Sequence, residues 1–315
     1  MQLSALRDLF SSLSLPQDAP QGRRLFHGRG RLVPGLEQLT IDYLPPVLWV
    51  GLFKSADDAF LDELKSQLVA LANSEQWVES GLSSIQLQHR YLQPCEVDLV
   101  YGDAVQQTEI QEGDLKFGLR FGRNQNTGLF LDMSQGRQWV QQHSSQARVL
   151  NLFAYTCGFS VAAIAGGAKQ VVNLDMAKGA LSTGRENHQR NGHDLRSVSF
   201  LGHDLFNSWG KLKKSGPYEM VVIDPPSFQK GSFALTKDYG KVLRRLDSLT
   251  VDGAQVLVCA NSPDVTPDYL IDMMAEEAPQ FSLVERLANP AVFADVDEQS
   301  SLKVMVFVKN KAVDA

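Results

Sequence analysis

Between residues 148 and 259, short apolar segments alternate with segments of helical pattern. The apolar segments are 148–153, 170–174, 197–201, 219–223 and 255–259, and helical patterns over 159–165 and up to about residue 191 lie between them. Strands that alternate with helices build βαβ units, which place their strands parallel in one sheet. The sequence therefore predicts an α/β domain around a parallel sheet in this part of the chain.

The last two apolar segments break this alternation. Segments 281–287 and 302–308 follow each other with a loop and no helical pattern between them. Consecutive strands joined by a loop pair antiparallel, whereas parallel strands need a crossover. With the five earlier segments they predict a seven-stranded sheet that ends in a C-terminal antiparallel hairpin.

The N-terminal third has a less regular pattern. Segment 47–53 reads as a buried strand, 57–71 has apolar residues at helical spacing with Ser55 or Asp57 as a cap, and 85–88 and 115–119 alternate as half-buried strands. We predict a small α+β domain over residues 1–120, a candidate for substrate binding. The α/β domain then occupies residues 121–315.

Hydropathy, cysteine content and net charge argue against several classes of protein. No run of about 20 apolar residues occurs, so no membrane span is expected. The three cysteines are scattered, which predicts neither a metal site nor a disulfide framework and suits a reducing cytoplasm. The net charge of −6 argues against a general nucleic-acid-binding surface. The basic stretch 23–31 has two interpretations, a solvated loop or a contact to phosphate.

The first strand of the α/β domain leads into a turn with one glycine. In such sheets the ligand lies beyond the carboxyl ends of the strands. A dinucleotide site would require GxGxxG here, so a nicotinamide dehydrogenase is disfavoured and an adenosyl group without phosphate is favoured. The candidate cofactor-binding residues in this turn are Asn151, Phe153, Tyr155, Thr156 and Gly158.

Acidic residues follow the next strands. Asp175 ends the second strand, where a carboxylate can accept from ribose hydroxyls. Asp204 follows the third, where it can accept from the adenine amino group. Each could instead cap the helix that comes after it.

The fourth strand ends in Asp224, Pro225, Pro226, Ser227 and Phe228. Two prolines fix the backbone and remove two amide donors, which leaves the carboxylate and carbonyl groups as acceptors. Such an array fits the edge of an amine or nucleobase, and Phe228 could stack on the ring. The alternative is a rigid turn with a core phenylalanine.

In these motifs the chain resembles the bacterial 23S ribosomal RNA methyltransferases that modify carbon 5 of cytosine or nitrogen 7 of guanine. The resemblance covers about residues 115–310. It implies a Rossmann-like class I methyltransferase fold, S-adenosyl-L-methionine as cofactor, and 23S ribosomal RNA or a ribosomal precursor as partner. It also assigns cofactor contacts to a segment before the sheet, which in relatives closes over the cofactor. The matching residues are 127–132, including Thr127, Phe130 and Asp132, with Arg137, then 149–160, Asp175, Asp204 and 224–228.

One position departs from the carbon-5 enzymes, which need a cysteine thiolate to attack the cytosine ring. This chain has Asn261 where those relatives place their cysteine, and Cys259 lies within an apolar strand. Asp224, Pro225, Pro226, Phe228 and Asn261 are therefore the candidate catalytic residues, and Asp224 is also a candidate cofactor-binding residue. A base nitrogen, with guanine favoured, is the expected methyl acceptor. Three alternatives stay open: carbon-5 methylation, a small-molecule or protein methyltransferase, and an inactive RNA-binding relative.

Overall fold

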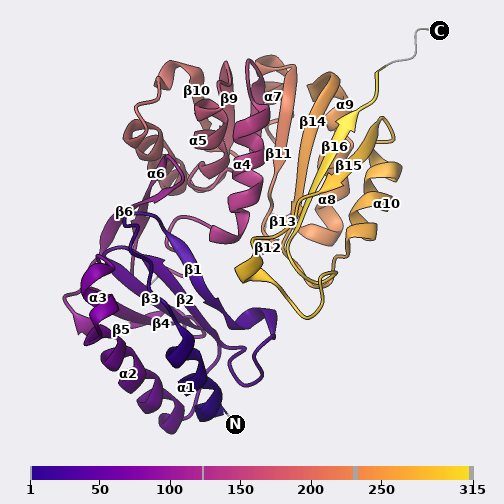
Figure 1. Ribbon diagram of the computed structural model, residues 1–315. Coiled ribbons are helices and arrows are strands. Elements are labelled where there is room, and N and C mark those ends of the chain that lie inside the picture. Colours follow the sequence, from indigo (N-terminus) through magenta and orange to yellow (C-terminus); the bar gives the residue numbers. More distant parts are fainter. Residues whose placement is uncertain (1, 123, 230–232, 312–315) are drawn as a thin grey trace. The chain divides into compact units, whose positions relative to one another are not determined.

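The computed structural model describes residues 2–122, 124–229 and 233–311, which divide into two compact units (Figure 1). The first unit comprises residues 1–131 and 290–296, and the second comprises 132–289 and 297–315. The boundary thus lies at residue 131, where the sequence predicted residue 120, and part of the C-terminal hairpin loop belongs to the first unit. Each unit has its own hydrophobic core.

The first unit contains a five-stranded sheet in the order β1-β2-β3-β4-β5. Only β3 and β4 pair in parallel, and they are joined through α2 and α3. The elements of this unit are α1 (Gln2–Ser12), β1 (Arg23–His27), β2 (Leu39–Leu44), β3 (Val47–Leu52), α2 (Asp58–Ala72), α3 (Glu75–Glu79), β4 (Ser84–His89), β5 (Glu96–Gly102), β6 (Gln107–Glu112) and β7 (Leu115–Arg120), with 3-10 turns η1 (Gly28–Gly30) and η4 (Ala291–Phe293).

The predicted elements of this unit are present, with one correction. Asp57 caps α2, because its carboxylate accepts from the backbone N–H of Phe60 at 2.8 Å. The interpretation of residues 23–31 as a solvated loop is wrong. Residues Arg23–His27 form β1, which pairs antiparallel with β2, and Gly28–Gly30 form a 3-10 turn.

The second unit contains a seven-stranded sheet in the order β10-β9-β8-β11-β14-β16-β15. The first five of these strands are parallel, and β16 is antiparallel to both of its neighbours. The strands are β8 (Arg148–Leu152), β9 (Gln170–Leu174), β10 (Val198–Leu201), β11 (Tyr218–Ile223), β14 (Thr250–Ala260), β15 (Phe281–Arg286) and β16 (Lys303–Lys309). The predicted α/β class, the parallel sheet and the antiparallel C-terminal pair are confirmed.

Helices and short elements connect these strands. They are η2 (Leu131–Met133), α4 (Ser134–His143), α5 (Gly158–Ala165), α6 (Lys178–Arg190), η3 (Leu195–Ser197), α7 (Trp209–Ser215), α8 (Leu235–Leu243), α9 (Leu246–Leu249) and α10 (Pro267–Glu277), with the two-residue strands β12 (Phe228–Gln229) and β13 (Phe233–Ala234). Among the described residues, no helix is both long and apolar enough to cross a membrane.

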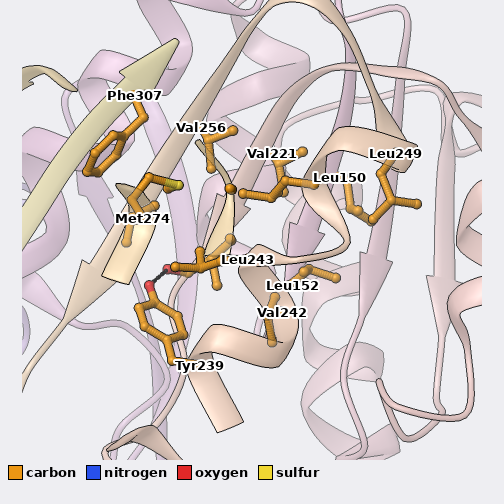
Figure 2. Packing of buried hydrophobic residues seen from close by; sticks show 14 of the residues in the cluster. Leu150, Leu152, Val221, Tyr239, Val242, Leu243, Leu249, Val256, Met274 and Phe307 are labelled. Atoms are coloured by element: carbon orange, nitrogen blue, oxygen red, sulfur yellow. Dashed lines mark hydrogen bonds between the residues drawn. The ribbon is translucent and has the colours of Figure 1, made fainter. Parts of the chain in front are cut away.

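The core of the second unit lies on both faces of the sheet, as expected when helices cover each side of parallel strands. Alternate strand residues belong to different clusters: Leu150 and Val221 pack with α8 and α10 (Figure 2), whereas Val149 and Val222 pack with α4 and α5. This two-sided burial fixes the sheet, so the loops at its carboxyl edge start from defined positions.

Candidate active site

The sheet order of the second unit reverses at β8. The chain leaves β8 for β9 and β10 on one side, then returns to β11 and β14 on the other. Ligands of open α/β sheets bind beyond the carboxyl ends of the strands at such a switch point. The loops after β8, β9, β11 and β14 therefore form the candidate site.

The loop after β8 has an unusual backbone. Phe153, Tyr155 and Cys157 have φ values of 57°, 45° and 63°, which lie in the left-handed region. For residues other than glycine this conformation costs about 1–2 kcal/mol each, so neighbouring contacts must hold it. One of them is the Asp175 carboxylate, whose Oδ2 accepts from the Tyr155 N–H at 2.8 Å. Gly158, the one glycine of the predicted turn and a candidate cofactor-binding residue, is the first residue of α5.

Both acids predicted for the cofactor also have local structural partners. The second oxygen of Asp175 accepts from the N–H of Ala177 at 2.7 Å, just before α6. Asp204 accepts from the N–H of Asn207 at 3.0 Å. The alternative interpretation, that each acid caps the helix after it, is wrong: the N-cap residues of α6 and α7 are Ala177 and Ser208, and the two acids instead hold the turns before these helices. Since a carboxylate offers about four lone-pair sites, both can also accept from a ligand.

A buried polar network lies behind this loop. The Asn151 amide donates to the Asn173 side chain at 2.9 Å, and Asn173 donates to Ser160 Oγ at 2.9 Å. Ser160 Oγ lies 2.9 Å from His188 Nε2, and His188 Nδ1 lies 3.0 Å from His193 Nδ1. Burial, and then the neighbouring His193, lower the pKa of His188 to about 3. A neutral imidazole has one donor and one acceptor nitrogen, so a neutral His188 can bond to Ser160 with one nitrogen and to His193 with the other.

The network gives Asn151, a predicted cofactor-binding residue, a structural role. Its side chain is 1% exposed and bonded inside the sheet, so the structure places it as a support for the loop. Ser160 lies within the segment 149–160 that the resemblance covers, but nothing in the sequence indicated Asn173 or His188, because polar residues within an apolar strand or helix do not reveal their partners.

Helix α6 packs closely against the same loop. A Cβ atom at Gly184 would lie 2.3 Å from Cys157 Sγ, so only glycine fits there. The side chain of Asn187, one helical turn later, donates to the Thr156 carbonyl at 3.1 Å. The predicted residue Thr156 is thus 5% exposed and fixed through its backbone.

The loop after β11 contains a carboxyl group with a strongly shifted pKa. Burial, and then the negative charge of Asp132, raise the pKa of Asp224 to about 7, while Arg137 acts in the opposite direction. Arg137 is buried, at 3% exposure. The structure therefore brings Asp132 and Asp224, predicted from distant segments, into one electrostatic group.

The ends of β11 and β14 are joined by two hydroxyl groups. Tyr239 Oη lies 2.9 Å from the Cys259 carbonyl and 3.2 Å from the Ile223 carbonyl, and both receive its hydrogen bond. Ser227 Oγ donates to the Asn261 carbonyl at 2.5 Å. These bonds hold the segment after Asp224 beside the segment that begins at Asn261.

The remaining residues of the predicted acceptor motif differ in exposure. Pro225 is buried, whereas Pro226 and Asn261 are exposed. The side chain of Phe228 lies outside the described part of the structure, so its predicted stacking role is untested. Phe233, which the sequence did not suggest, packs edge-on against Phe153 with ring centroids 4.9 Å apart.

Cys259 is an inner residue of β14. It is 0% exposed and pairs with Val304 of β16. Burial, followed by the charges of Asp224 and Asp132, raises the pKa of the Cys259 thiol well above its usual range. A thiol that stays protonated is a poor nucleophile.

Lys303 is a second residue that the sequence did not reveal. Its side chain is 0% exposed, and its Nζ donates to the Ser262 carbonyl at 2.6 Å. Burial, and then Arg286, lower the pKa of Lys303 to about 8. A lysine at the start of an apolar strand normally suggests a solvent-facing position, whereas here it supports the loop after β14.

The segment predicted to close over the cofactor is divided between the two units. Thr127 and Phe130 belong to the first unit, where the Thr127 carbonyl accepts from the Arg120 N–H at 2.8 Å and Phe130 is 42% exposed. Asp132 begins the second unit. Among the described residues, no group of three or more His, Cys, Asp or Glu side chains forms a metal site.

The model of the S-adenosylmethionine-dependent methyltransferase family matches residues 23–308. The ribosomal RNA large subunit methyltransferase I of Aeromonas salmonicida is 37% identical over 127 residues, which cover 40% of this chain and 32% of the relative. The enzyme of the same name from Aliivibrio fischeri is 29% identical over 237 residues, 75% of this chain and 58% of the relative. The chain thus matches only part of these relatives' length.

Solved structures have the same fold. SMU.776 in complex with SAH gives a TM-score of 0.78 at 24% identity, over 98% of this chain and 80% of that one. A SAM-dependent methyltransferase from Agrobacterium tumefaciens gives a TM-score of 0.68 at 16% identity, over 95% of this chain and 93% of that one.

Proposed function

The chain belongs to the family of S-adenosylmethionine-dependent methyltransferases, and on that premise we propose that it methylates a base nitrogen of ribosomal RNA, with guanine favoured. The observation that carries the choice of atom is the strand-end arrangement after β11 and β14. It has a carboxyl group with a pKa of about 7 at Asp224, and Cys259 is buried within β14.

The residues after β8 and β9 fit an adenosyl ligand. The left-handed loop is preformed, and the segment from Asn151 to Ser160 contains one glycine, whereas a loop that holds a pyrophosphate has the GxGxxG pattern. Asp175 and Asp204 retain acceptor capacity for hydroxyl and amino groups. When bound, S-adenosylmethionine supplies a methyl group on a positively charged sulfur.

The residues after β11 and β14 fit a nucleobase acceptor. Pro225 and Pro226 lack N–H groups, so their backbone presents carbonyl acceptors. Ionised Asp224 can accept from an amine, which increases the electron density on its nitrogen. A ring nitrogen such as nitrogen 7 of guanine has a free lone pair and needs no general base. In either case these side chains position the acceptor, and alignment supplies most of the acceleration.

The RNA substrate is supported by the names of the relatives, which are ribosomal RNA large subunit methyltransferases. The test is transfer of an isotope-labelled methyl group to ribosomal RNA from cells that lack this protein, followed by mass spectrometry of the nucleosides. We expect label in one methylated guanosine, and much slower labelling with Asp224→Asn. Label in a protein or in a small molecule instead of RNA would contradict the proposal.

The atom is tested separately with RNA that contains 5-fluorocytosine. A cysteine mechanism forms a covalent bond between sulfur and the base, which this analogue traps. We expect no such adduct, and Cys259→Ala should keep most activity. A trapped adduct, or loss of activity in a folded Cys259→Ala variant, would restore carbon-5 methylation.

A further inference from the structure

Three arginines of the first unit lie over two aromatic rings, two of them over the same ring. The guanidinium carbons of Arg29, in η1, and Arg90, after β4, lie 4.4 Å and 4.7 Å from the centroid of Phe53. Arg24 of β1 lies over Phe293 at 4.9 Å. We refer to Arg24, Arg29 and Arg90 as the arginine cluster.

The positive charge of the arginine cluster is only partly balanced. Arg24 forms a two-bond ion pair with Asp42, at 2.5 Å and 3.1 Å. Within the described chain, no carboxylate pairs with the side chains of Arg29 or Arg90. Three cations therefore share one paired carboxylate. The mutual effect is visible in the pKa of Arg90, which is lowered by burial first and then by the charges of Arg29 and Arg24.

The ion pairs distinguish Arg29 from the other arginines of the basic stretch 23–31. Arg23 pairs with Asp18, and Arg31 pairs with Asp295 at 2.6 Å. Arg29 differs, since no described residue forms an ion pair with its side chain. Its companion Arg90 comes from a distant part of the sequence.

The backbone that carries Arg29 is fixed on both sides. A Cβ atom at Gly28 would lie 1.8 Å from the Leu36 carbonyl oxygen, and one at Gly30 would lie 2.0 Å from that of Ala294. Glycine is therefore required on each side of Arg29. The turn cannot rearrange without losing this packing, so the exposed Arg29 side chain starts from a defined place.

The Arg90 side chain is likewise oriented. It donates to the Gln125 carbonyl and, at 3.1 Å, to Asn126 Oδ1. A guanidinium has five N–H donors, and two of its nitrogens are used in these bonds. Contact with the Phe53 ring holds the guanidinium without using N–H groups, which leaves donors for an anion.

We propose that Arg29 and Arg90, oriented by Phe53, form a phosphodiester-binding site through which the first unit holds the RNA substrate. Arginine binds phosphate oxygens with paired N–H donors, which suits two guanidinium groups beside one ring. The site gives the first unit a role in a chain whose net charge is −6. The inference rests on the proposed RNA substrate.

The test measures binding of a fluorescent RNA oligonucleotide to the full chain over a range of salt concentrations. Arg29→Gln should weaken binding by about tenfold and lower the slope of log affinity against log salt by roughly 0.7–0.9, the value for one phosphate contact. Arg90→Gln should act in the same direction. Arg29→Lys should retain the slope but bind more weakly, because lysine keeps the charge and loses the paired donors.

Arg23→Gln is the matched control, since it removes the same charge from the same segment at a residue already paired with Asp18. Circular dichroism and thermal melting check that each variant is folded. If Arg29→Gln and Arg90→Gln match Arg23→Gln in affinity and slope while the wild type methylates RNA, the site is wrong and the proposed function stands.

Two competition measurements in the same binding assay identify the class of ligand. Inorganic phosphate should compete only weakly, since the site is proposed for a polymer that makes other contacts. If a polyglutamate peptide displaces RNA more effectively than unlabelled RNA does, the site binds acidic protein and the inference is overturned. If the wild type neither binds nor methylates RNA, the proposed function fails and the inference fails with it.

Discussion

The two halves of the sheet's carboxyl edge are built from opposite kinds of group. The half after β8 and β9 rests on a buried histidine, His188, whose pKa is lowered to about 3, so it is neutral. The half after β11 and β14 contains a carboxyl group, Asp224, whose pKa is raised to about 7. Burial is the main cause in both cases. The same physical effect thus gives one half a fixed neutral support and the other a group that titrates near neutral pH.

This difference suggests a division of labour. In the first half, backbone conformation and neutral hydrogen bonds define a surface whose shape does not change with pH. In the second half, Asp224 gains or loses a proton where enzymes of this kind work, so it can respond to the acceptor base. Substitutions in the first half should therefore act on cofactor affinity, and those in the second on the rate of transfer.

The largest effect is expected at Asp224. Asp224→Asn should lower kcat by roughly 10²–10³-fold, the usual contribution of a positioned acid or base, with cofactor affinity changed much less. Since the ionised form accepts from the base, kcat/KM of the wild type should rise with pH through about 7. The measurement is methyl transfer to RNA from pH 5.5 to 8.5.

The cause of the shift can be tested with the same assay. Because Asp132 raises the pKa of Asp224, Asp132→Asn should move the inflection to lower pH. Asp247→Asn is the control, since Asp247 is not among the groups that shift Asp224 and pairs instead with Lys309, outside the candidate site. A wild-type profile that is flat between pH 6 and 8 would remove Asp224 from the proton chemistry.

The next prediction concerns stability, and the two halves should respond to pH in opposite directions. A carboxyl whose folded pKa is raised stabilises the fold fully only below its unfolded pKa near 3.9, and this contribution is lost as pH rises to about 7. Asp224→Asn should therefore gain roughly 2–3 kcal/mol over the wild type in unfolding free energy between pH 5 and 8.

For His188 the sign is reversed. Its folded pKa of about 3 lies below the unfolded value near 6.5, so its contribution is complete above pH 6.5 and is lost as pH falls. His188→Gln should be less stable at pH 7 but should lose roughly 2 kcal/mol less than the wild type between pH 7 and 5. Urea unfolding at each pH measures both variants. Parallel pH curves for the wild type and both variants would contradict the comparison.

In both halves the sequence predicted the positions of the acidic residues but not their pKa values. Strand ends are visible as apolar runs that stop at a polar residue, so Asp175, Asp204 and Asp224 could be found. The class of the sheet and its antiparallel end followed from the same pattern. The pKa values could not be foreseen, because they depend on burial and on groups such as Asp132 that are far away in the sequence.

The backbone conformations and contacts that hold the site in place could not be predicted from the sequence either. Phe153, Tyr155 and Cys157 are not glycines, so their residue types do not indicate that their backbone is left-handed. Lys303 and the Tyr239 hydroxyl act through contacts between strands that are adjacent only in the sheet. Long-range packing decides such features, and a single sequence does not contain it.

A smaller effect is expected in the cofactor half. Asp175→Ala removes the acceptor for the Tyr155 N–H, which holds a left-handed residue, and for any ribose hydroxyl. We expect cofactor affinity to fall by roughly 10- to 100-fold, from one or two charge-assisted hydrogen bonds, with kcat at saturating cofactor largely retained. Calorimetric titration measures the affinity. Unchanged affinity in a folded variant would place Asp175 outside the cofactor site.

The smallest effect is expected for Tyr239→Phe. This variant tests whether the Tyr239 hydroxyl only stabilises the fold or also aligns the ends of β11 and β14. Tyr239→Phe removes the hydroxyl that bonds the carbonyls of Cys259 and Ile223 and should cost about 1–3 kcal/mol, since both carbonyls are buried. Tyr218→Phe is a matched control: Tyr218 begins β11, and its buried hydroxyl bonds the Leu212 carbonyl at 2.9 Å. Urea unfolding should show a similar loss for both variants.

Their activities should differ. Only Tyr239 joins the carboxyl ends of β11 and β14, so only Tyr239→Phe should lower kcat, by about fivefold if roughly 1 kcal/mol of alignment is lost. Cofactor affinity should stay unchanged in both variants, because the loop after β8 is untouched. Equal kcat values for the two variants would mean that the Tyr239 hydroxyl stabilises the fold without aligning the site. A loss of cofactor affinity in Tyr239→Phe would instead show that the two halves of the edge are coupled.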